Sequence, residues 1–342
     1  MALLEVCDLR VEFDTYGGVV KAVRGVDFSV ERGETLAVVG ESGSGKSATI
    51  QAIAGLIPSP PGRVTSGSVF FEGREILGLP LKEKNRIRGK RIGLVFQDPM
   101  TSLNPTMPVG KQITEALRVH EGMGSGAARK RAIELLEHVR IFDAAARVKD
   151  YPFQFSGGMR QRVMIAMAIA CGPALLLADE PTTALDVTIQ AEILSLLKEL
   201  QRESGMSIVL VTHDLGVVAE VADRVAVMYA GQIVERGTTE QVFSRPAHPY
   251  TLGLKAALPA DREGERERLV AIPGSPPDLF RPPSGCAYFE RCPYAMRICE
   301  THPPPLSTLE AGQMSRCWLH HEMVSDRRPP ELFGEPPIEA AS

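Results

Sequence analysis

One stretch of eight residues constrains the fold more than any other part of the chain. It reads G-x-x-x-x-G-K-S and consists of Gly40, Glu41, Ser42, Gly43, Ser44, Gly45, Lys46 and Ser47. An apolar run, residues 35–39, precedes it directly, and a helix-compatible run, residues 48–56, follows it directly. Strand, glycine-rich loop and helix in this order are the context in which such a motif binds phosphate. The sequence therefore predicts an α/β fold built around an anion-binding loop.

The residue types in this loop indicate how it would bind its ligand. Glycines let successive backbone N–H groups turn inward toward an anion, and the N-terminus of the following helix adds its positive dipole end. We expect Lys46 to reach the terminal phosphates and Ser47 to offer its hydroxyl to the Mg²⁺ that accompanies them. A glycine-rich turn that contains Gly-Lys-Ser by chance would not need the flanking strand and helix. We predict a nucleoside triphosphate site.

Charge and hydropathy exclude several classes of protein. A net charge of −4 over 342 residues argues against a protein that holds nucleic acid by bulk electrostatics. The first residues lack the basic and apolar regions of a signal peptide. The most apolar stretch, residues 163–178, is broken by Gly172-Pro173, whereas a spanning helix needs about 18–20 unbroken residues. We expect a buried helix, a turn and a buried strand there, so any transport role would require membrane partners.

A second candidate feature is a buried strand that ends in two acids. Residues 174–178 are continuously apolar and are followed by Asp179 and Glu180. A run that is apolar on both faces is typical of a central parallel strand, and ligands of open α/β sheets bind at the carboxyl ends of such strands. We predict that Asp179 holds Mg²⁺ and that Glu180 polarises the attacking water as general base.

Three other side chains are candidates because of their places along the chain. Gln97 follows a strand-like run, where it can contact Mg²⁺ or its water, and His213 ends the strand predicted at 207–212, where it can sense the γ-phosphate. Tyr16 lies in a glycine turn thirty residues before Lys46, where it can stack on the base. Taken singly, each also has an ordinary interpretation as a solvent-facing, structural or packing residue.

A second glycine-rich helix entrance follows a helical region. Residues 110–148 show helical periodicity without a strand, which predicts a helical subdomain over about residues 98–172. Near its end, Ser156, Gly157 and Gly158 precede a helical run and form another arrangement suited to phosphate. Two such cradles far apart in sequence suggest that they face each other across a dimer.

In this order the motifs resemble the ATP-binding subunit of an ABC transporter over residues 1 to about 240. The resemblance assigns Gly40–Ser47 to Walker A, Phe155–Met159 to the ABC signature, and Leu175–Asp179 with Glu180 to Walker B and its catalytic glutamate. It assigns Gln97 to the Q-loop and Ala184-Leu185-Asp186 to the D-loop. It also assigns His213 to the switch histidine and Tyr16 to the aromatic residue that stacks on the base. The signature departs from its commonest form at Phe155 and Met159, while its Ser-Gly-Gly centre is intact.

Three segments narrow the resemblance to the peptide-importer branch: residues 96–105, His248–Thr251 and Gly285–Cys317. This branch takes up dipeptides, oligopeptides and, in some members, nickel or glutathione. The resemblance implies a mostly parallel sheet flanked by helices, an N-terminal antiparallel β-subdomain, a helical signature subdomain and a C-terminal extension. That extension, residues 241–342, holds sixteen of the 26 prolines, which predicts a loop-rich structure.

The resemblance also implies partners and a location. Two ATP-binding subunits, identical or paralogous, would sandwich two ATP molecules, each between Walker A of one subunit and Ser156–Gly158 of the other, with Asp186 nearby. Two membrane permeases and an extracytoplasmic solute-binding protein would complete the importer at the cytoplasmic face of the bacterial inner membrane. The alternatives are a soluble ABC ATPase of translation or DNA repair and a redox-regulated ATPase with an iron–sulfur cluster.

Four of the six cysteines lie in the extension as C-x5-C-x6-C-x17-C, namely Cys286, Cys292, Cys299 and Cys317. We expect the other two, Cys7 and Cys171, to be buried thiols. Zinc sites usually show closer pairs of cysteines, so the spacing favours an iron–sulfur cluster over zinc or reduced thiols. His302, His320 and His321 are alternative ligands. The family resemblance implies a [4Fe–4S] centre in some members.

Overall fold

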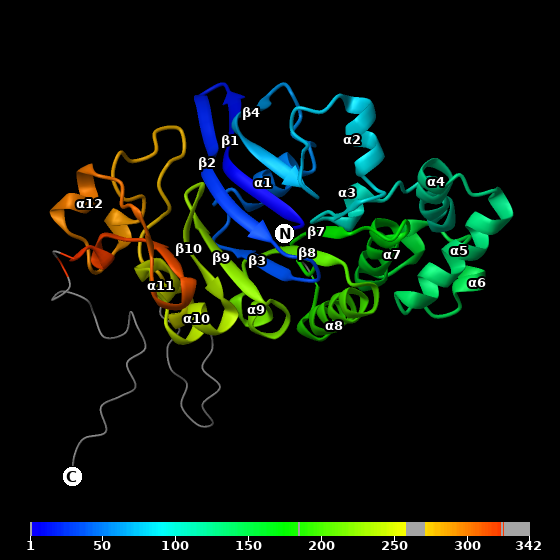
Figure 1. The fold of residues 1–342 in the computed structure, drawn as a ribbon. Coiled ribbons are helices and arrows are strands. Elements are labelled where there is room, and N and C mark those ends of the chain that lie inside the picture. The colour runs from blue at the N-terminus through cyan, green and yellow to red at the C-terminus, as the bar shows by residue number, and fades with distance from the viewer. Residues whose placement is uncertain (1, 184, 258–270, 323, 325–342) are drawn as a thin grey trace, which may run out of the picture.

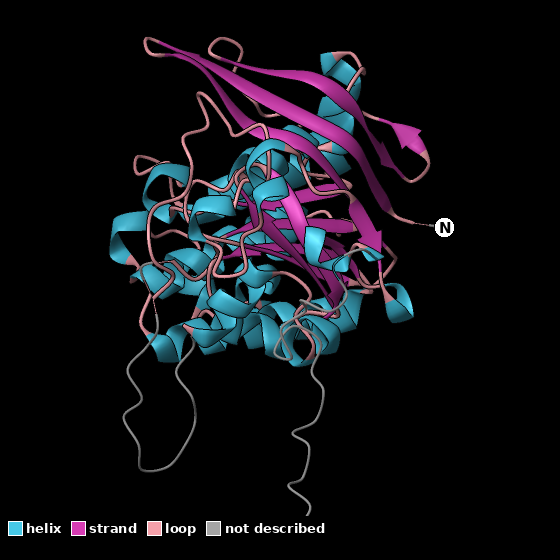
Figure 2. Ribbon diagram, turned by 90° about the vertical axis from the view of Figure 1, so that its left-hand side faces the viewer, coloured by secondary structure: helices cyan, strands magenta, loops and turns pink. Residues whose placement is uncertain are grey.

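The computed structural model describes residues 2–183, 185–257, 271–322 and 324 of the chain. Its strands form one antiparallel sheet and one larger, mostly parallel sheet (Figure 1). Figure 2 shows the long strands of the antiparallel sheet lying over one side of the molecule, while the helices surround the larger sheet. The α/β architecture and the N-terminal antiparallel subdomain are therefore as predicted.

The antiparallel sheet begins with the hairpin that the sequence predicted. Its strands lie in the order β2 (Gly18–Val30), β1 (Leu4–Thr15), β4 (Gly62–Phe71) and β5 (Arg74–Glu75). Side chains alternate along β1, so that Val6 is buried while Cys7 is exposed. The prediction of a buried Cys7 is therefore wrong, and Cys171 is only half-buried. The short strand β5 was not predicted.

The larger sheet brings Gly40, Asp179, Glu180 and His213 to one edge, because each lies at the carboxyl end of a parallel strand. Its order is β11 (Leu306–Thr308), β12 (Met314–Arg316), β10 (Gln232–Thr238), β9 (Arg224–Tyr229), β3 (Thr35–Val39), β8 (Ser207–Thr212), β7 (Leu175–Asp179) and β6 (Ile92–Val95). The strands from β9 to β6 run parallel. Since β3, β7 and β8 are buried along their whole length, they form the central strands that their apolar sequences predict.

Helices lie between the strands of this sheet along the chain. The helix α1 (Lys46–Ile53) follows β3 directly, and α2 (Leu81–Ile87) lies before β6. The helix α8 (Val187–Ser204) follows β7 and α9 (Leu215–Val221) follows β8. As its periodicity predicted, α8 buries Ile193, Leu196, Leu197 and Leu200.

All of the secondary structure between β6 and β7 is helical. It consists of α3 (Pro99–Ser102), α4 (Val109–Glu121), α5 (Ser125–His138), α6 (Ala144–Arg147), the 3₁₀ turn η1 (Pro152–Gln154) and α7 (Gly157–Ile169). These helices share one apolar core with α8, formed by side chains such as Ile113, Leu135 and Val163. Figure 1 shows α4, α5 and α6 at one end of the molecule.

The described part of the C-terminal extension lies at the opposite end (Figure 1). It contains α10 (Thr239–Ser244), α11 (Pro249–Ala256), η2 (Phe289–Arg291), α12 (Arg297–Thr301), η3 (Glu310–Gly312) and η4 (Trp318–His320), besides β11 and β12. Because β12 pairs with β10, the extension continues the larger sheet. It also shares a buried cluster with the sheet, in which Tyr250 and Tyr288 pack with Tyr229. The domain boundary near residue 240 stays a prediction.

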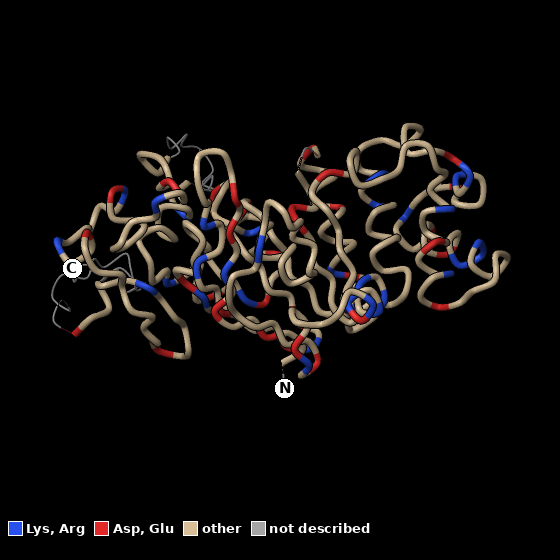
Figure 3. Tube along the Cα trace, turned by 90° about the horizontal axis from the view of Figure 1, so that it is seen from above, with Lys and Arg blue, Asp and Glu red and all other residues tan. Residues whose placement is uncertain are grey.

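Charged residues of both signs alternate over the length of the molecule (Figure 3). This distribution agrees with the small net charge of −4. Within the described residues, we find no helix with the length and apolar content that crossing a bilayer would require.

Candidate nucleotide site

The Walker A loop lies between β3 and α1, as predicted, and two of its glycines are required by close backbone contacts. A Cβ on Gly40 would lie 2.1 Å from the carbonyl oxygen of Met228, and one on Gly45 would lie 2.3 Å from that of Ala22. Both residues also have a positive φ, which favours glycine. The loop is therefore held against the backbones of β9 and β2.

Lys46 is buried inside this loop. Its Nζ donates hydrogen bonds to the carbonyl oxygens of Gly40 and Glu41, at 2.8 and 3.0 Å, and lies 3.9 Å from Glu180 Oε1. Burial lowers the pKa of Lys46, against the opposing effect of Glu180, Asp179 and Glu41. The hydroxyl of Ser44 is also buried and has no hydrogen-bond partner among the described residues. Both groups fit a loop that binds a phosphate anion.

Ser47 and Asp179 meet at the predicted metal position. The Ser47 hydroxyl donates to Asp179 Oδ1 at 2.8 Å, although the two residues are 132 positions apart in the sequence. Burial raises the pKa of Asp179, while the hydrogen bond from Ser47 lowers it. One carboxylate, one hydroxyl and the phosphates of a nucleotide are the kind of ligand set that Mg²⁺ takes in such sites. The residues present therefore fit this ion.

Glu180 is the centre of the site. Its Oε2 accepts hydrogen bonds from the Gln97 amide at 2.9 Å and from the Thr183 hydroxyl at 2.8 Å, and lies 3.4 Å from His213 Nδ1. Glu180 has a φ of 43°, in the left-handed region, and its backbone N–H donates to Val211. Strained backbone of this kind is concentrated at functional sites. The structure thus brings Gln97, Glu180 and His213 together.

The sequence analysis did not select Thr183. Its signal was present, because a threonine three residues after Glu180 in a tight turn can return its hydroxyl to the carboxylate. The short loop after β7 makes this contact local, and Thr183 adds a third neighbour to the carboxylate besides Gln97 and His213.

The signature residues lie apart from this cluster. Ser156 caps α7 by accepting a hydrogen bond from the backbone N–H of Met159, and Gly158 packs so closely on Ile189 that a Cβ would lie 2.7 Å from it. Asp186 caps α8 through the N–H of Ile189 at 3.0 Å. Among the described residues, no hydrogen bond or ion pair joins Ser156–Gly158 to the Walker A loop. Ala184 of the predicted D-loop lies outside the described residues.

The extension contacts the chain beside Tyr16 and at Glu41. Tyr16 is fully exposed at the tip of the β1–β2 hairpin. The next residue, Gly17, lies beside the ring of Phe280 from the extension. Glu41 was predicted to bind the nucleotide as a residue of the Walker A loop, and its carboxylate forms an ion pair with Arg291 of the extension. Both contacts join residues far apart in the sequence, so no local pattern predicts them.

The four cysteines of the extension gather in one region. Burial, together with a smaller effect of the neighbouring thiols, raises the pKa of Cys286 to about 11 and the pKa values of Cys292 and Cys317 to about 12. The backbone N–H of Cys286 donates to the carbonyl of Cys299 at 2.7 Å. However, no three His, Cys, Asp or Glu side chains of the described residues are arranged to hold one metal ion. The cluster therefore does not have the compact geometry of a zinc site.

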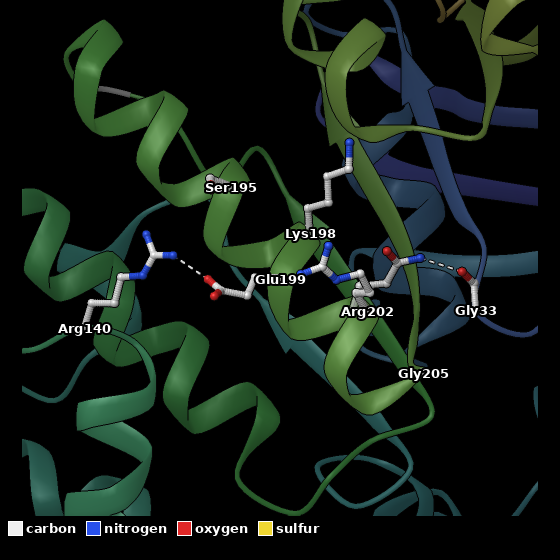
Figure 4. A pocket seen from close by; sticks show the side chains of 8 residues that line it. Gly33, Arg140, Ser195, Lys198, Glu199, Arg202 and Gly205 are labelled. Carbon is white, nitrogen blue, oxygen red and sulfur yellow. Dashed lines mark hydrogen bonds and ion pairs between the residues drawn. The ribbon is translucent and has the colours of Figure 1, made fainter.

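A separate pocket is lined mainly by residues of α8, and none of the predicted site residues lines it (Figure 4). Arg140 forms an ion pair with Glu199 across it, and the Gln201 amide donates to the carbonyl of Gly33. The polar groups on its walls are therefore largely paired with one another, unlike Ser44 in the Walker A loop.

Comparisons with known proteins agree with the motifs and the geometry. The family described as ABC transporter matches residues 23–183, and the C-terminal region of oligopeptide/dipeptide transporters matches residues 234–299. The Bacillus subtilis oligopeptide transport ATP-binding protein OppD is 58% identical over 96% of this chain and 92% of that protein. The Bacillus subtilis dipeptide transport ATP-binding protein DppD is 52% identical over 94% of this chain and 95% of that protein.

Solved structures give the same result. An ATP-binding cassette, MJ0796, solved as a dimer in a post-hydrolysis state with ADP and phosphate, is 30% identical with a TM-score of 0.62. The match covers 69% of this chain and 98% of that one, so most of the uncovered part of this chain is its extension. From its motifs, its fold and these similarities, the chain belongs to the ATP-binding subunits of ABC transporters, in the group with the oligopeptide/dipeptide transporter C-terminal region.

Proposed function

We propose that this chain works with a second ATP-binding subunit to drive the uptake of dipeptides, oligopeptides or a related small solute. As an ABC-type ATPase, it hydrolyses ATP to ADP and phosphate. Two relatives more than 50% identical carry the names of oligopeptide and dipeptide transport proteins, which supports a peptide substrate. The observation that carries the proposed reaction is the Glu180 carboxylate, on which Gln97, Thr183 and His213 converge.

The Walker A side of the site would bind the triphosphate. Lys46 now donates to two backbone carbonyls of its own loop, and the phosphates of ATP would take over these hydrogen bonds. Ser47 and Asp179 would hold Mg²⁺, with Gln97 beside it. The ion would neutralise charge that develops on the phosphates. Tyr16 would stack on the base at the open side of the site.

Glu180 would act as general base on the attacking water. Its carboxylate is directed by the Gln97 amide and the Thr183 hydroxyl, so its orientation is fixed before ATP arrives. His213 lies next to the same oxygen and is largely exposed, which leaves it free to contact the γ-phosphate. Positioned groups of this kind lower the barrier because they need no reorganisation during the reaction.

A second subunit would complete the site with its Ser156-Gly157-Gly158 loop and Asp186. This loop ends at the N-terminus of the thirteen-residue helix α7, which offers an anion-binding end. Its separation from the Walker A loop within one chain supports a site shared between subunits. The dimeric state of the similar ATP-binding cassette supports the same arrangement.

The remaining partners would be two permeases and an extracytoplasmic solute-binding protein, with this chain peripheral to the cytoplasmic face of the inner membrane. Because the segment from Gln97 to Pro108 lies between β6 and α4, at the start of the helical subdomain, its movement would transmit the state of the ATP site to a permease. Co-purification with two polytopic membrane proteins would support this assembly. Turnover that needs no membrane partner would support the soluble or redox-regulated alternatives.

Replacing the general base tests the proposed reaction. The Glu180→Gln variant keeps an acceptor for Gln97 and Thr183 but cannot take a proton, so hydrolysis should fall by a factor of at least about 10² while ATP binding persists. Single-turnover hydrolysis by the assembled complex measures the first effect, and trapping of ATP-bound dimers measures the second. Glu220→Gln, an exposed glutamate of α9, is the matched control. Wild-type turnover in Glu180→Gln would overturn the assignment of the base.

We also propose that Cys286, Cys292, Cys299 and Cys317 hold a [4Fe–4S] cluster. The four thiols are grouped and at least half-buried, yet they lack the close arrangement of a zinc site. In a four-iron cluster each thiolate binds a different iron atom, which sets the sulfurs farther apart. When bound, such a cluster would cross-link the proline-rich loops of the extension.

The cluster is tested by anaerobic purification with iron and sulfide analysis. About four irons per chain are expected, with loss of iron and a lower unfolding temperature in Cys299→Ser. The half-buried Cys171 lies outside the extension, so Cys171→Ser serves as the control. Stoichiometric zinc in the wild-type chain would contradict the cluster. So would a wild-type chain that contains no metal and unfolds at the same temperature as Cys299→Ser.

A further inference from the structure

The extension contacts the Walker A loop through one buried arginine. Arg291 ends η2, directly before Cys292. Its Nη1 donates to Glu41 Oε2 at 2.6 Å, and its Nη2 donates to Glu41 Oε1 at 2.9 Å. The Arg291 side chain is only 4% exposed, and that of Glu41 is 28% exposed. Two parallel hydrogen bonds between a guanidinium and a carboxylate fix their relative orientation as well as their distance.

Other groups hold the same guanidinium in place. Its Nε donates to the carbonyl oxygen of Pro273 at 2.9 Å, and Nη1 also donates to the Tyr229 hydroxyl at 3.2 Å. The pKa of Arg291 is raised, first of all by its hydrogen bonds to Glu41. Arg291 is therefore a rigid bridge between the extension, the end of β9 and the Walker A loop.

A second residue beyond the Walker motifs holds the backbone of Glu41. This residue is Tyr250, in α11. The backbone N–H of Glu41 donates a hydrogen bond to the Tyr250 hydroxyl at 2.8 Å. The Tyr250 ring is buried and packs on Tyr229 and Tyr288, with centroid distances of 4.5 and 5.4 Å. Three aromatic rings thus fix the position of the hydroxyl that Glu41 contacts.

Glu41 in turn contacts the lysine that binds phosphate. Its carbonyl oxygen accepts the hydrogen bond from Lys46 Nζ at 3.0 Å. A continuous series of contacts therefore runs from Arg291 and Tyr250 through Glu41 to Lys46. We call Arg291, Tyr250 and Glu41 the loop clamp.

We propose that Arg291 and Tyr250 are positioning residues of the ATP site, through which the C-terminal extension sets the conformation of the Walker A loop and its affinity for ATP. This inference rests on the proposed ATP site. The clamp holds the loop by its second residue, whose carbonyl orients Lys46, so that the site is preorganised for the phosphates. Without the clamp, ATP would have to order the loop on binding, and part of its binding free energy would be lost.

Variants of Arg291 in the full-length chain test this inference. Arg291→Met keeps the length of the apolar side chain but removes the guanidinium group that donates both hydrogen bonds to Glu41. It should raise the Kd for Mg-ATP by about tenfold. Arg291→Lys restores a charge without the two parallel bonds and should give an intermediate Kd. Arg297→Met, at an exposed arginine of α12, is the matched control and should bind ATP as the wild type does.

Glu41→Gln gives an independent measurement on the other side of the pair. If the clamp acts through Glu41, the effects of Glu41→Gln and Arg291→Met on Kd should be less than additive in the double variant. Unfolding of the nucleotide-free variants, followed in parallel, separates a loss of stability from a loss of affinity. Should Arg291→Met fail to fold, Arg291→Lys and Glu41→Gln decide the question by the same two readouts.

The outcomes distinguish this inference from the proposed ATP site. Folded Arg291→Met or Arg291→Lys with wild-type affinity for ATP would overturn the clamp and leave the ATP site intact. A wild-type chain that does not bind Mg-ATP, or a Lys46→Ala chain that binds it unchanged, would overturn the ATP site itself. A higher KM for ATP with little change in kcat in the assembled complex would support the clamp.

Discussion

Lys46 shows how a single buried side chain is prepared for its ligand. It lies among backbone carbonyls and near Glu180, where burial lowers its pKa and the surrounding oxygens favour its charged form. Its partners in the absence of ATP are thus weaker substitutes for phosphate oxygens.

We therefore predict that Lys46→Ala weakens ATP binding by about 10- to 100-fold, because hydrogen bonds to charged groups contribute about 1.5–3 kcal/mol each. Calorimetric titration of the isolated chain with Mg-ATP measures the change in Kd. Lys198→Ala serves as the control. It removes an exposed lysine of α8 whose Nζ donates to the backbone carbonyl of Glu220. Equal affinities for the two variants would contradict the role of Lys46.

At the scale of the elements, β10 connects the ATPase sheet to the extension through a buried carboxyl group. Glu235 lies in β10 and accepts hydrogen bonds from the backbone N–H groups of Ala247 and His248 and from the Gln313 amide. Burial raises its pKa from 4.5 to about 7, although these hydrogen bonds oppose the shift. Burial also lowers the pKa of the neighbouring His248 to about 3.

This raised pKa predicts a pH-dependent difference in stability between the wild type and Glu235→Gln. The folded protein binds the Glu235 proton more tightly than the unfolded chain, so its stabilising contribution is complete below pH 4.5 and is lost as the pH rises to about 7. Glutamine does not titrate. The variant should therefore gain about 3 kcal/mol in free energy of unfolding, relative to the wild type, between these pH values.

Urea unfolding of both proteins at about pH 5 and pH 7.5 measures this difference. The titration of His248 and of the surface carboxylates is common to both proteins and largely cancels in the comparison. A gap between the two free energies of unfolding that is the same at both pH values would contradict the raised pKa of Glu235.

At the scale of the whole molecule, the helical subdomain and the extension lie at opposite ends of one continuous sheet (Figure 1). The cluster around Glu180 lies at the edge of that sheet, while Ser156 precedes α7 and accepts a hydrogen bond from the backbone N–H of Met159. The two halves of the proposed shared ATP site therefore lie on separate parts of one chain.

This separation predicts different effects for the two halves. Ser156→Arg should leave the Kd of the isolated chain for Mg-ATP unchanged, because among the described residues no hydrogen bond or ion pair joins Ser156 to the Walker A loop. In the assembled complex the same variant should reduce hydrolysis by a factor of about 10² or more, since the large cation would fill the cradle that faces the partner's ATP. Arg160 of the same helix, replaced by Lys, is a charge-conserving control.

Titration of the isolated chain and turnover by the complex with its permeases provide the two measurements. If Ser156→Arg weakens ATP binding by the isolated chain, the signature loop belongs to the same chain's site, and the shared site is wrong. If turnover in the complex is unchanged, Ser156 does not contact the nucleotide.

The sequence by itself determined the central elements and most of the cluster around Glu180. Continuous apolar runs predicted β3, β7 and β8, because strands covered on both faces tolerate few polar residues. In a parallel sheet the residues after such strands share one edge, so the order of motifs already placed Gly40, Asp179, Glu180 and His213 together. Thr183 lay within the same local reach, although the sequence analysis did not select it.

Only the tertiary structure decided the contacts made by the extension. The pairing of β12 with β10, the hydrogen bond from Gln313 to the buried Glu235 and the bidentate contact between Arg291 and Glu41 join residues that are 78 to 250 positions apart. No periodicity or local motif encodes such contacts, because they arise from the packing of proline-rich loops on a preformed sheet edge. The sequence predicted that Glu41 belongs to the Walker A loop. Only the fold decided that its carboxylate pairs with Arg291.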